Sequence, residues 1–357
     1  TGWTWDRDIN FISAQKVGSA VTLCYMGVSA AAELYACRAT STDGISFTKP
    51  NLGLISYVVD ANSNISWRAR APRIGFLDDA TEAPTYLGVG ETVSGGGDDG
   101  VYLYSSSDGI AWTLIKTLYS GPLDGNYREG RAITRLADGR YVVYYVGGQL
   151  TDRRSPGYFV SLTSDPTGSW TNIGFVIDAK SAGEQRYSFE ASKVGDAFIA
   201  LAGRFVRSTE QIDNVELLTS RDCGTWKTID AQWFAIGSSG AWDDEMIIPA
   251  SPPIEVGNDW YFYYTGFGAN HAAGLPRNAL IGAATLPKGR IASIGTAGTV
   301  RLKPITTGAA DTLTVNCNAS GGSLKVELLD EQNNVIYGYS RDDCDAITTD
   351  TYSTAVT

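Results

Sequence analysis

The sequence has one histidine, His271, and five cysteines among its 357 residues, and this scarcity bears first on metal chemistry. The cysteine separations match neither a CxxC nor a CxxH pattern, so we expect no zinc site and no transition-metal catalysis. Oxygen ligands would suit a structural Ca²⁺, but we expect no required cofactor. Cys24 and Cys37 lie at mirror positions about a predicted turn, so they should face each other as a disulfide or as reduced thiols; Cys317 and Cys344 could pair as well.

Positive charge is also scarce, with 28 Lys and Arg against 39 Asp and Glu. Because a polyanionic backbone would be repelled and no local basic patch opposes this, nucleic acid is not an expected partner. The sequence has no run of about 18 or more apolar residues and does not open with a charged and then apolar leader. We therefore expect a soluble protein without membrane insertion.

Aromatic residues and glycine are abundant, and they occur in an internal repeat of about sixty residues. A strand rich in aromatic and β-branched residues ends in glycine five times, with steps of 63, 57, 56 and 63 residues. These strands end at Gly27, Gly90, Gly147, Gly203 and Gly266. The first four copies are each followed, in the same phase, by a turn with an aromatic: STDGISF (41–47), SSDGIAW (106–112), SDPTGSW (164–170) and SRDCGTW (220–226).

Asp-Gly and Pro-Thr-Gly at these places predict tight turns, so Asp43, Asp108, Asp165 and Asp222 are expected to serve structure rather than catalysis. Each unit then consists of three or four strands joined by hairpins. Five units predict an all-β fold with a five-bladed β-propeller over residues 1–295, which we favour over a long β-sandwich or a β-helix. A change in the sequence pattern after residue 295 predicts a separate β-sandwich portion over residues 296–357.

Several motifs resemble the propeller-and-sandwich glycoside hydrolases of the superfamily containing families 32 and 43, in particular its bacterial and phage members. They are SxDGxxFxKPxLGL (41–54), TSRDxxxW (219–226), WDxxMI (242–247), a YYTG strand shortly before His271, and the GSLKVELLD segment near residue 325. The resemblance implies an enzyme that cleaves glycosidic bonds with three carboxyl groups. Two of its motifs differ here: Trp5-Asp6-Arg7-Asp8-Ile9-Asn10 stands where Asn-Asp-Pro is usual, and Arg70-Ala71-Pro72 lacks the usual carboxylate.

The residues preceding each glycine-ending strand should meet at one mouth of the propeller. From the family pattern we expect Asp8 to be the nucleophile or base, Glu129 the proton donor, Glu190 a competing donor and Asp243 the group that orients substrate or tunes the donor. The same reasoning gives residues that would bind substrate: Arg70, Arg128, Arg186, Trp242 and His271. The alternatives are structural: Asp8 on the surface, Glu129 in a simple ion pair, and Trp242 packed between blades.

Two other functions fit the same residues. The Asp-containing turns also occur in sialidases, which are six-bladed and would use an arginine cluster and a tyrosine nucleophile. A carbohydrate-binding propeller without catalysis, such as a receptor-binding part of a phage tail, is the alternative from another class. The expected partner is in each case a poly- or oligosaccharide, in an extracellular or secreted setting or on a virion tail, with assembly through the C-terminal sandwich as an option.

Overall fold

The structure is a computed structural model, and it describes most of the chain. The described residues are 6–28, 34–49, 58–59, 65–66, 77–78, 86–90, 100–120, 128–150, 153–178, 180–181, 183–250, 253–293, 297–306, 308 and 311–357. Within them the secondary structure is almost entirely β, and η1 (His271–Ala273) is a single 3₁₀ turn. The all-β prediction is confirmed.

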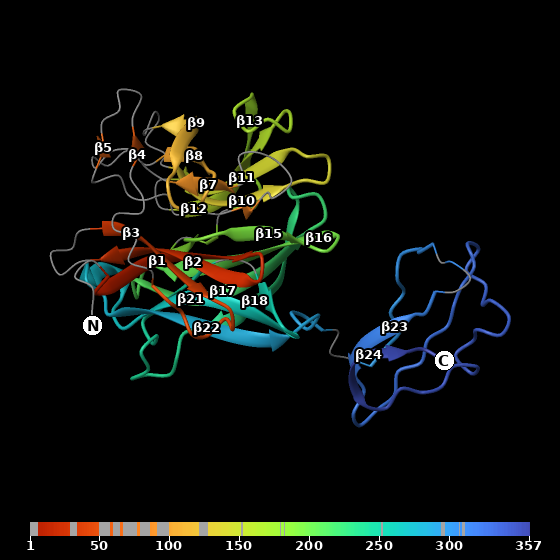
Figure 1. Ribbon diagram of the computed structural model, residues 1–357. Helices are drawn as coiled ribbons and strands as arrows, with labels where there is room; N and C mark the ends of the chain where they lie inside the picture. The colour runs from red at the N-terminus through yellow and green to blue at the C-terminus, as the bar shows by residue number, and fades with distance from the viewer. Residues whose placement is uncertain are drawn as a thin grey trace. The chain divides into compact units, whose positions relative to one another are not determined.

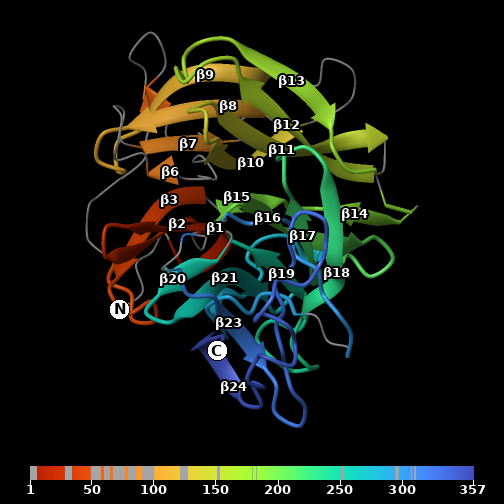
Figure 2. The same ribbon diagram turned by 90° about the vertical axis from the view of Figure 1, so that its right-hand side faces the viewer.

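Five sheets form the blades of a propeller (Figures 1 and 2). Blade I contains β1 (Asp8–Val17), β2 (Ala20–Val28) and β3 (Leu34–Ser41), and blade II contains β6 (Leu77–Asp78), β7 (Tyr86–Gly90), β8 (Gly100–Ser106) and β9 (Thr113–Ser120). Blade III contains β10 (Arg128–Arg135), β11 (Tyr141–Leu150), β12 (Arg153–Ser161) and β13 (Trp170–Phe175). Blade IV contains β14 (Glu184–Arg186), β15 (Glu190–Val194), β16 (Ala197–Val206), β17 (Gln211–Ser220) and β18 (Trp226–Ala235). Blade V contains β19 (Met246–Pro249), β20 (Ile254–Val256), β21 (Asp259–Phe267) and β22 (Ala279–Pro287), and a separate pair consists of β4 (Val58–Val59) and β5 (Ile65–Ser66).

Contacts between strands close the five blades into a ring. The first strands of neighbouring blades touch, β1 with β6 and β10 with both β6 and β15, and blade IV contacts β19 of blade V. Blade V returns to the start, because β20 and β21 both contact β1. The five-bladed propeller predicted from the repeat is therefore the observed fold.

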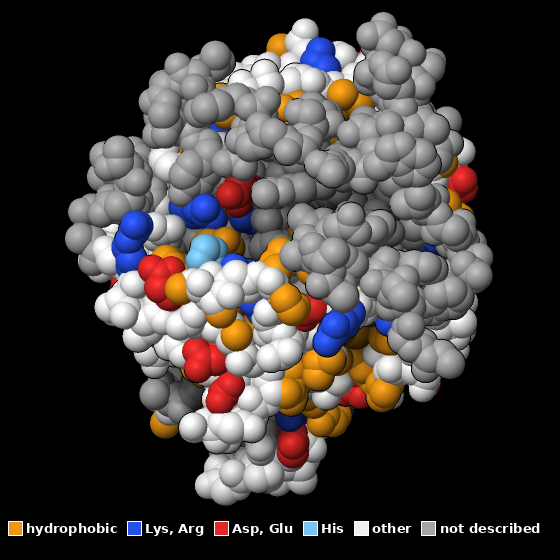
Figure 3. Space-filling view, turned by 90° about the vertical axis from the view of Figure 1, so that its left-hand side faces the viewer, with side chains coloured by type: hydrophobic (Ala, Val, Ile, Leu, Met, Phe, Trp, Pro, Cys, Tyr) orange, Lys and Arg blue, Asp and Glu red, His pale blue; other side chains and the backbone are white. Residues whose placement is uncertain are grey.

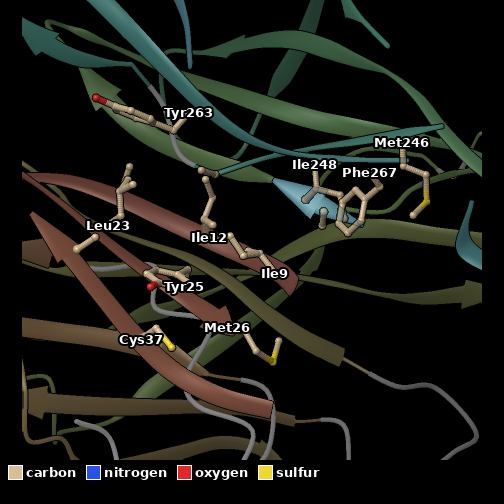
Figure 4. Packing of buried hydrophobic residues seen from close by; sticks show 14 of the residues in the cluster. Ile9, Ile12, Leu23, Tyr25, Met26, Cys37, Met246, Ile248, Tyr263 and Phe267 are labelled. Atoms are coloured by element: carbon tan, nitrogen blue, oxygen red, sulfur yellow. The ribbon is translucent and has the colours of Figure 1, made fainter. Parts of the chain in front are cut away.

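Hydrophobic cores lie between the blades. One cluster joins blades I and V through side chains such as Ile12, Leu23, Met246 and Phe267, which face one another in Figure 4. Further clusters lie between blades II and III and between blades III and IV. Each large apolar side chain buried in this way contributes about 1.5–3 kcal/mol, so the ring is held chiefly by contacts between sheets.

The glycine-ending strand of the repeat is β2, β7, β11, β16 or β21, which is second in the pairing order of its sheet. Residues 141–148 of β11 are all buried, which is why this strand is continuously apolar instead of alternating. In blades III to V this glycine lies beside a residue on or near the first strand of the blade. Gly147 pairs with Arg128, the carbonyl of Gly203 accepts the backbone N–H of Tyr187 at 2.8 Å, and a Cβ on Gly266 would overlap the side chain of Asp243.

The repeated turns have the expected structural role. Asp43 Oδ1 accepts backbone N–H groups from Ile45 and Ser46 at 2.8 and 2.7 Å, and Asp108 and Asp222 accept equivalent pairs. In blade III, Asp165 accepts the backbone N–H of Thr167 at 2.9 Å. These carboxylates stabilise the turns that follow β3, β8, β12 and β17.

The hairpin between β2 and β3 forms as predicted, but its register differs by one residue from the expected one. Cys24 pairs with Arg38 and Cys37 pairs with Tyr25, so the two thiols do not face each other. All five cysteines are free, which also leaves Cys317 and Cys344 unbridged. Because neighbouring residues in a strand point to opposite faces, a one-residue offset separates the pair.

The chain divides into two compact units, Thr1–Thr285 and Leu286–Thr357, compared with the predicted boundary after residue 295. In the second unit the described residues form one two-stranded sheet, β23 (Thr314–Asn318) with β24 (Asp350–Ala355), and isolated bridges. A two-sheet sandwich is not what they show. Only Cys344 and Ile347 are buried among the apolar residues described in this unit, so its sheet has little core to pack against.

Candidate active site

Asp8, at the start of β1, is almost fully buried, and backbone groups surround its carboxylate. Its Oδ1 accepts the N–H of Ile9 at 3.0 Å and also that of Ala279, while Oδ2 accepts the N–H of Arg277. The carboxylate thus joins the first strand of blade I to the segment that leads into β22. Both oxygens of the predicted nucleophile are engaged in this junction.

Glu129, in β10, is buried to 7% exposure between two guanidinium groups. Its Oε2 accepts from Nη2 of Arg131, two residues along the same strand, and its Oε1 lies 3.4 Å from Nη2 of Arg154 in β12. Arg154 lies near the start of β12, just after the hairpin from β11. The antiparallel order β10–β11–β12 therefore brings Arg154 close to Glu129 and Arg131. The two guanidinium groups offset the cost of burying this carboxylate.

A tyrosine and the single histidine lie beside this group. The guanidinium of Arg154 lies 4.4 Å from the ring centre of Tyr187, and that of Arg131 lies 5.9 Å from it. The Tyr187 hydroxyl and Nε2 of His271 are 2.8 Å apart, and Nδ1 of His271 is 3.6 Å from the Glu210 carboxylate. Side chains from blades III, IV and V therefore meet here. Figure 3 shows the histidine on this face, with Lys or Arg and Asp or Glu side chains beside it.

Burial lowers the pKa of His271, and the positive charges of Arg277 and Arg154 lower it further, against the opposite effect of Glu210 and Glu129. The imidazole is consequently neutral at pH 7 and has one N–H to donate. The Arg277 guanidinium donates to the His271 carbonyl at 2.9 Å, which fixes the loop that carries both residues. We refer to Glu129, Arg131, Arg154, Tyr187, Glu210, His271 and Arg277 as the mouth cluster.

Two of the predicted substrate-binding arginines lie in other contacts. Arg128 stacks over Tyr119 of blade II at 4.4 Å and over Tyr145 at 5.4 Å, so it packs between blades. Arg186 donates through Nε to the buried Glu216 at 2.9 Å and through Nη1 to the carbonyl of Asp178. The contacts described for Arg128 and Arg186 do not include a residue of the mouth cluster. Arg70, the third predicted arginine, lies outside the described residues.

The predicted pair Trp242 and Asp243 forms a second site element on blade V. The indole stacks on Tyr264, with ring centres 5.6 Å apart and an angle of 25°, and 40% of Trp242 is exposed. Asp243 Oδ2 accepts the Tyr264 hydroxyl at 2.8 Å. The carboxylate thereby fixes the ring beneath the tryptophan, and the loop beginning at Gly268, which leads to His271, passes close to the backbone of Trp242. Glu190 begins β15 three residues after Tyr187, half-buried and opposite Leu201.

Sequence reasoning placed Glu129 and His271 at the mouth, and the structure brings them into one cluster. It missed Arg154, Tyr187, Glu210 and Arg277 as site residues. Arg154 and Glu210 lie after a glycine-ending strand, in the next hairpin, whereas the predicted site residues were taken from the segments before such strands. Tyr187 directly follows Arg186. The sequence does not show which of the two side chains faces the cluster, and in the structure it is Tyr187.

Among the residues that the structure describes, no group of three or more His, Cys, Asp or Glu side chains could hold a metal ion. The described part of the chain likewise contains no helix long and apolar enough to cross a membrane. The mouth cluster itself offers carboxylate, phenol, imidazole and guanidinium groups.

Comparison with known proteins finds likeness at the level of structure. No protein-family model matches the chain, and no curated protein matches it in sequence. A proposed glycosidase of Bacteroides thetaiotaomicron superposes with a TM-score of 0.59 at 14% identity, over 80% of this chain and 88% of that one. A member of the GH130 family of mannoside phosphorylases, which contains glycoside hydrolases that target β-1,2-mannosidic linkages in Candida mannan, gives 0.55 at 14% identity over 80% and 86%. The N-acetylgalactosamine deacetylase of F. plautii, solved with blood group B trisaccharide, gives 0.54 at 14% over 82% and 93%.

The chain is a five-bladed β-propeller that resembles glycoside hydrolases. Identities this low show a shared fold and leave substrate and mechanism to the site itself. The neighbours of this propeller include a phosphorylase family and a deacetylase as well as glycosidases, so one architecture serves several reactions.

Proposed function

We propose that the protein is a glycoside hydrolase that cleaves a poly- or oligosaccharide at the mouth cluster. The observation that supports this most directly is Glu129, a buried carboxylate held by Arg131 and Arg154 beside a tyrosine and a neutral histidine from other blades. Burying an ionised group is costly, and here two arginines from two strands compensate for that cost. The structural neighbours with glycosidase names support the same class of reaction.

Glycoside hydrolysis needs one group that protonates the leaving oxygen and one that attacks the anomeric carbon or activates water. Two guanidinium groups favour the ionised form of Glu129, which suits it to act as base or nucleophile and not as the proton donor expected from the sequence. Asp8, with both oxygens bound to backbone N–H groups, would hold the loop of His271 and Arg277 in place. Trp242 would supply an aromatic face for a sugar ring.

The test is sugar release from a panel of plant, bacterial and algal polysaccharides and aryl glycosides by the wild type, Glu129→Gln and Glu184→Gln. Glu184 is a matched control, because it is a half-buried glutamate at the start of β14 whose described ion pair is with Lys180. We expect Glu129→Gln to lose about 10³-fold or more of kcat/KM, since it removes the attacking charge, and Glu184→Gln to retain activity. Full activity in folded Glu129→Gln would refute the assignment.

A glycan-binding protein without catalysis is the second candidate. The exposed indole of Trp242, supported by Tyr264 and Asp243, favours it, because such a platform binds sugars without any reaction. Binding on a glycan array combined with no release from any substrate would support this candidate and exclude the hydrolase.

A further inference from the structure

Tyr187 occupies a fixed position at the centre of the mouth cluster. Its backbone N–H bonds to Gly203, and its ring packs against Phe205 and His271 with centres 5.6 and 5.3 Å away. Only 9% of the residue is exposed, so the phenol has little freedom to turn. A hydroxyl held in this way is preorganised for a reaction at one point.

Three guanidinium groups lie near this phenol. Arg154 and Arg131 lie 4.4 and 5.9 Å from the ring centre. Burial lowers the pKa of Arg277, and the proximity of Tyr187 and Asp8 partly opposes that shift, which marks Tyr187 as a neighbour of a third arginine. Guanidinium groups beside the ring would stabilise negative charge that develops on the phenol oxygen during a proton transfer.

His271 and Glu210 complete the surroundings of the hydroxyl. Nε2 of His271 lies 2.8 Å from the phenol oxygen, where its N–H can donate to a phenolate in the tautomer that carries the proton on Nε2. Glu210 has a positive φ of 56°, an uncommon conformation for a residue other than glycine, and its carbonyl accepts the His271 N–H at 2.8 Å. Strain of this kind is found where a turn must present particular groups, here to the histidine.

On the basis that the mouth cluster hydrolyses a glycoside, we propose that Tyr187 is its proton donor. Glu129 takes a proton from a water molecule, and the water oxygen forms a bond to the anomeric carbon. The bond from that carbon to the glycosidic oxygen breaks, and this oxygen receives the Tyr187 proton and leaves as an alcohol. Exchange with solvent returns the proton from Glu129 to the Tyr187 phenolate, so the enzyme ends unchanged. The acid and base are then a phenol and a carboxylate instead of two carboxylates.

The experiment compares 2,4-dinitrophenyl and 4-methoxyphenyl glycosides of a sugar that the wild type releases. Dinitrophenolate leaves without protonation, whereas methoxyphenolate needs a proton. We expect Tyr187→Phe to lower kcat/KM for the methoxyphenyl glycoside by about 10²–10⁴-fold and for the dinitrophenyl glycoside by less than about tenfold. Tyr158→Phe is the matched control, because Tyr158 lies in β12 with its ring against Tyr144, and it should not separate the two substrates.

A second measurement uses 3-fluorotyrosine at position 187, which keeps the ring and acidifies the phenol. The alkaline limb of the kcat/KM profile should move to lower pH, since that limb reports the essential acid. The titratable and charged groups that face the phenol stay the same in this variant: Glu129, Arg131, Arg154, Glu210, His271 and Arg277.

The outcomes separate this proposal from the proposed function. Equal losses on both glycosides in Tyr187→Phe, or an unmoved alkaline limb with fluorotyrosine, would overturn the donor role and leave the hydrolase intact. A wild type that releases no sugar from any substrate would remove the hydrolase, and the donor role with it.

Discussion

Replacement of Asp8 by Asn should destabilise the propeller, because this carboxylate joins the first blade to the last. It accepts one backbone N–H on Oδ2 and two on Oδ1. An asparagine keeps one acceptor oxygen and turns an NH₂ group toward a backbone N–H, so at least one bond is lost and the others lose their charge. Hydrogen bonds to a charged group contribute about 1.5–3 kcal/mol each, so we expect a loss of about 2–4 kcal/mol. For a domain of this size that lowers Tm by roughly 4–16 °C.

The assay is thermal unfolding of the wild type, Asp8→Asn and Asp138→Asn, with sugar release measured well below the lowest Tm. Asp138 is an exposed aspartate paired with Arg140 at 2.8 Å, and its replacement should change Tm little. Asp8→Asn should keep measurable activity while it is folded. An unchanged Tm together with abolished activity would refute this reasoning and return Asp8 to the role of nucleophile.

Two further predictions follow from the described contacts. Trp242→Ala should weaken glycan binding by about tenfold, roughly 1.4 kcal/mol, because it removes the exposed ring that would stack on a sugar. Tyr352→Ala is the control, since it removes an exposed ring from the C-terminal unit and should leave the affinity unchanged. Equal affinities of the two variants on a glycan array would contradict the role of Trp242. The N–H of Thr225 holds the pKa of Asp222 at about 2, below the ordinary 3.8, so its contribution to stability is present above pH 4 and is lost as the pH falls through 2. As the pH is lowered from 5 to 2, the urea midpoint should therefore fall less in Asp222→Asn than in the wild type. Equal falls in the two proteins would show that protonation of Asp222 does not affect stability.

The fold could be predicted because the sequence repeats what each blade needs. A buried second strand must be apolar on both faces, and a tight turn must have an acceptor such as Asp108 or Asp222 for its backbone N–H groups. These requirements are local; the apolar strand recurs in all five blades and the turn aspartate in four, so both are visible as a period. The C-terminal unit has no such period, and the change of pattern after residue 295 predicted a sandwich where the described residues form one small sheet.

Register was harder to predict than topology. Cys24 and Cys37 lie in the expected hairpin, but a shift of one residue pairs them with Arg38 and Tyr25. The same uncertainty affects the mouth, where Arg186 turns to Glu216 while the next residue, Tyr187, points at His271. Alternation along a strand makes a one-residue error a change of face, and the sequence pattern alone does not determine the exact residue.

The mouth cluster differs from the rest of each blade because its residues do not repeat. Blade III supplies Glu129 and two arginines, blade IV a tyrosine and a strained glutamate, and blade V a histidine and an arginine. The strands and turns of the scaffold recur, so the repeat identifies the fold. The groups of the mouth cluster differ from blade to blade, so they are the residues that define the proposed chemistry. It follows that substitution of a repeated glycine or turn aspartate should affect stability in any blade, whereas substitution at the mouth should change the reaction and leave the other blades unaffected.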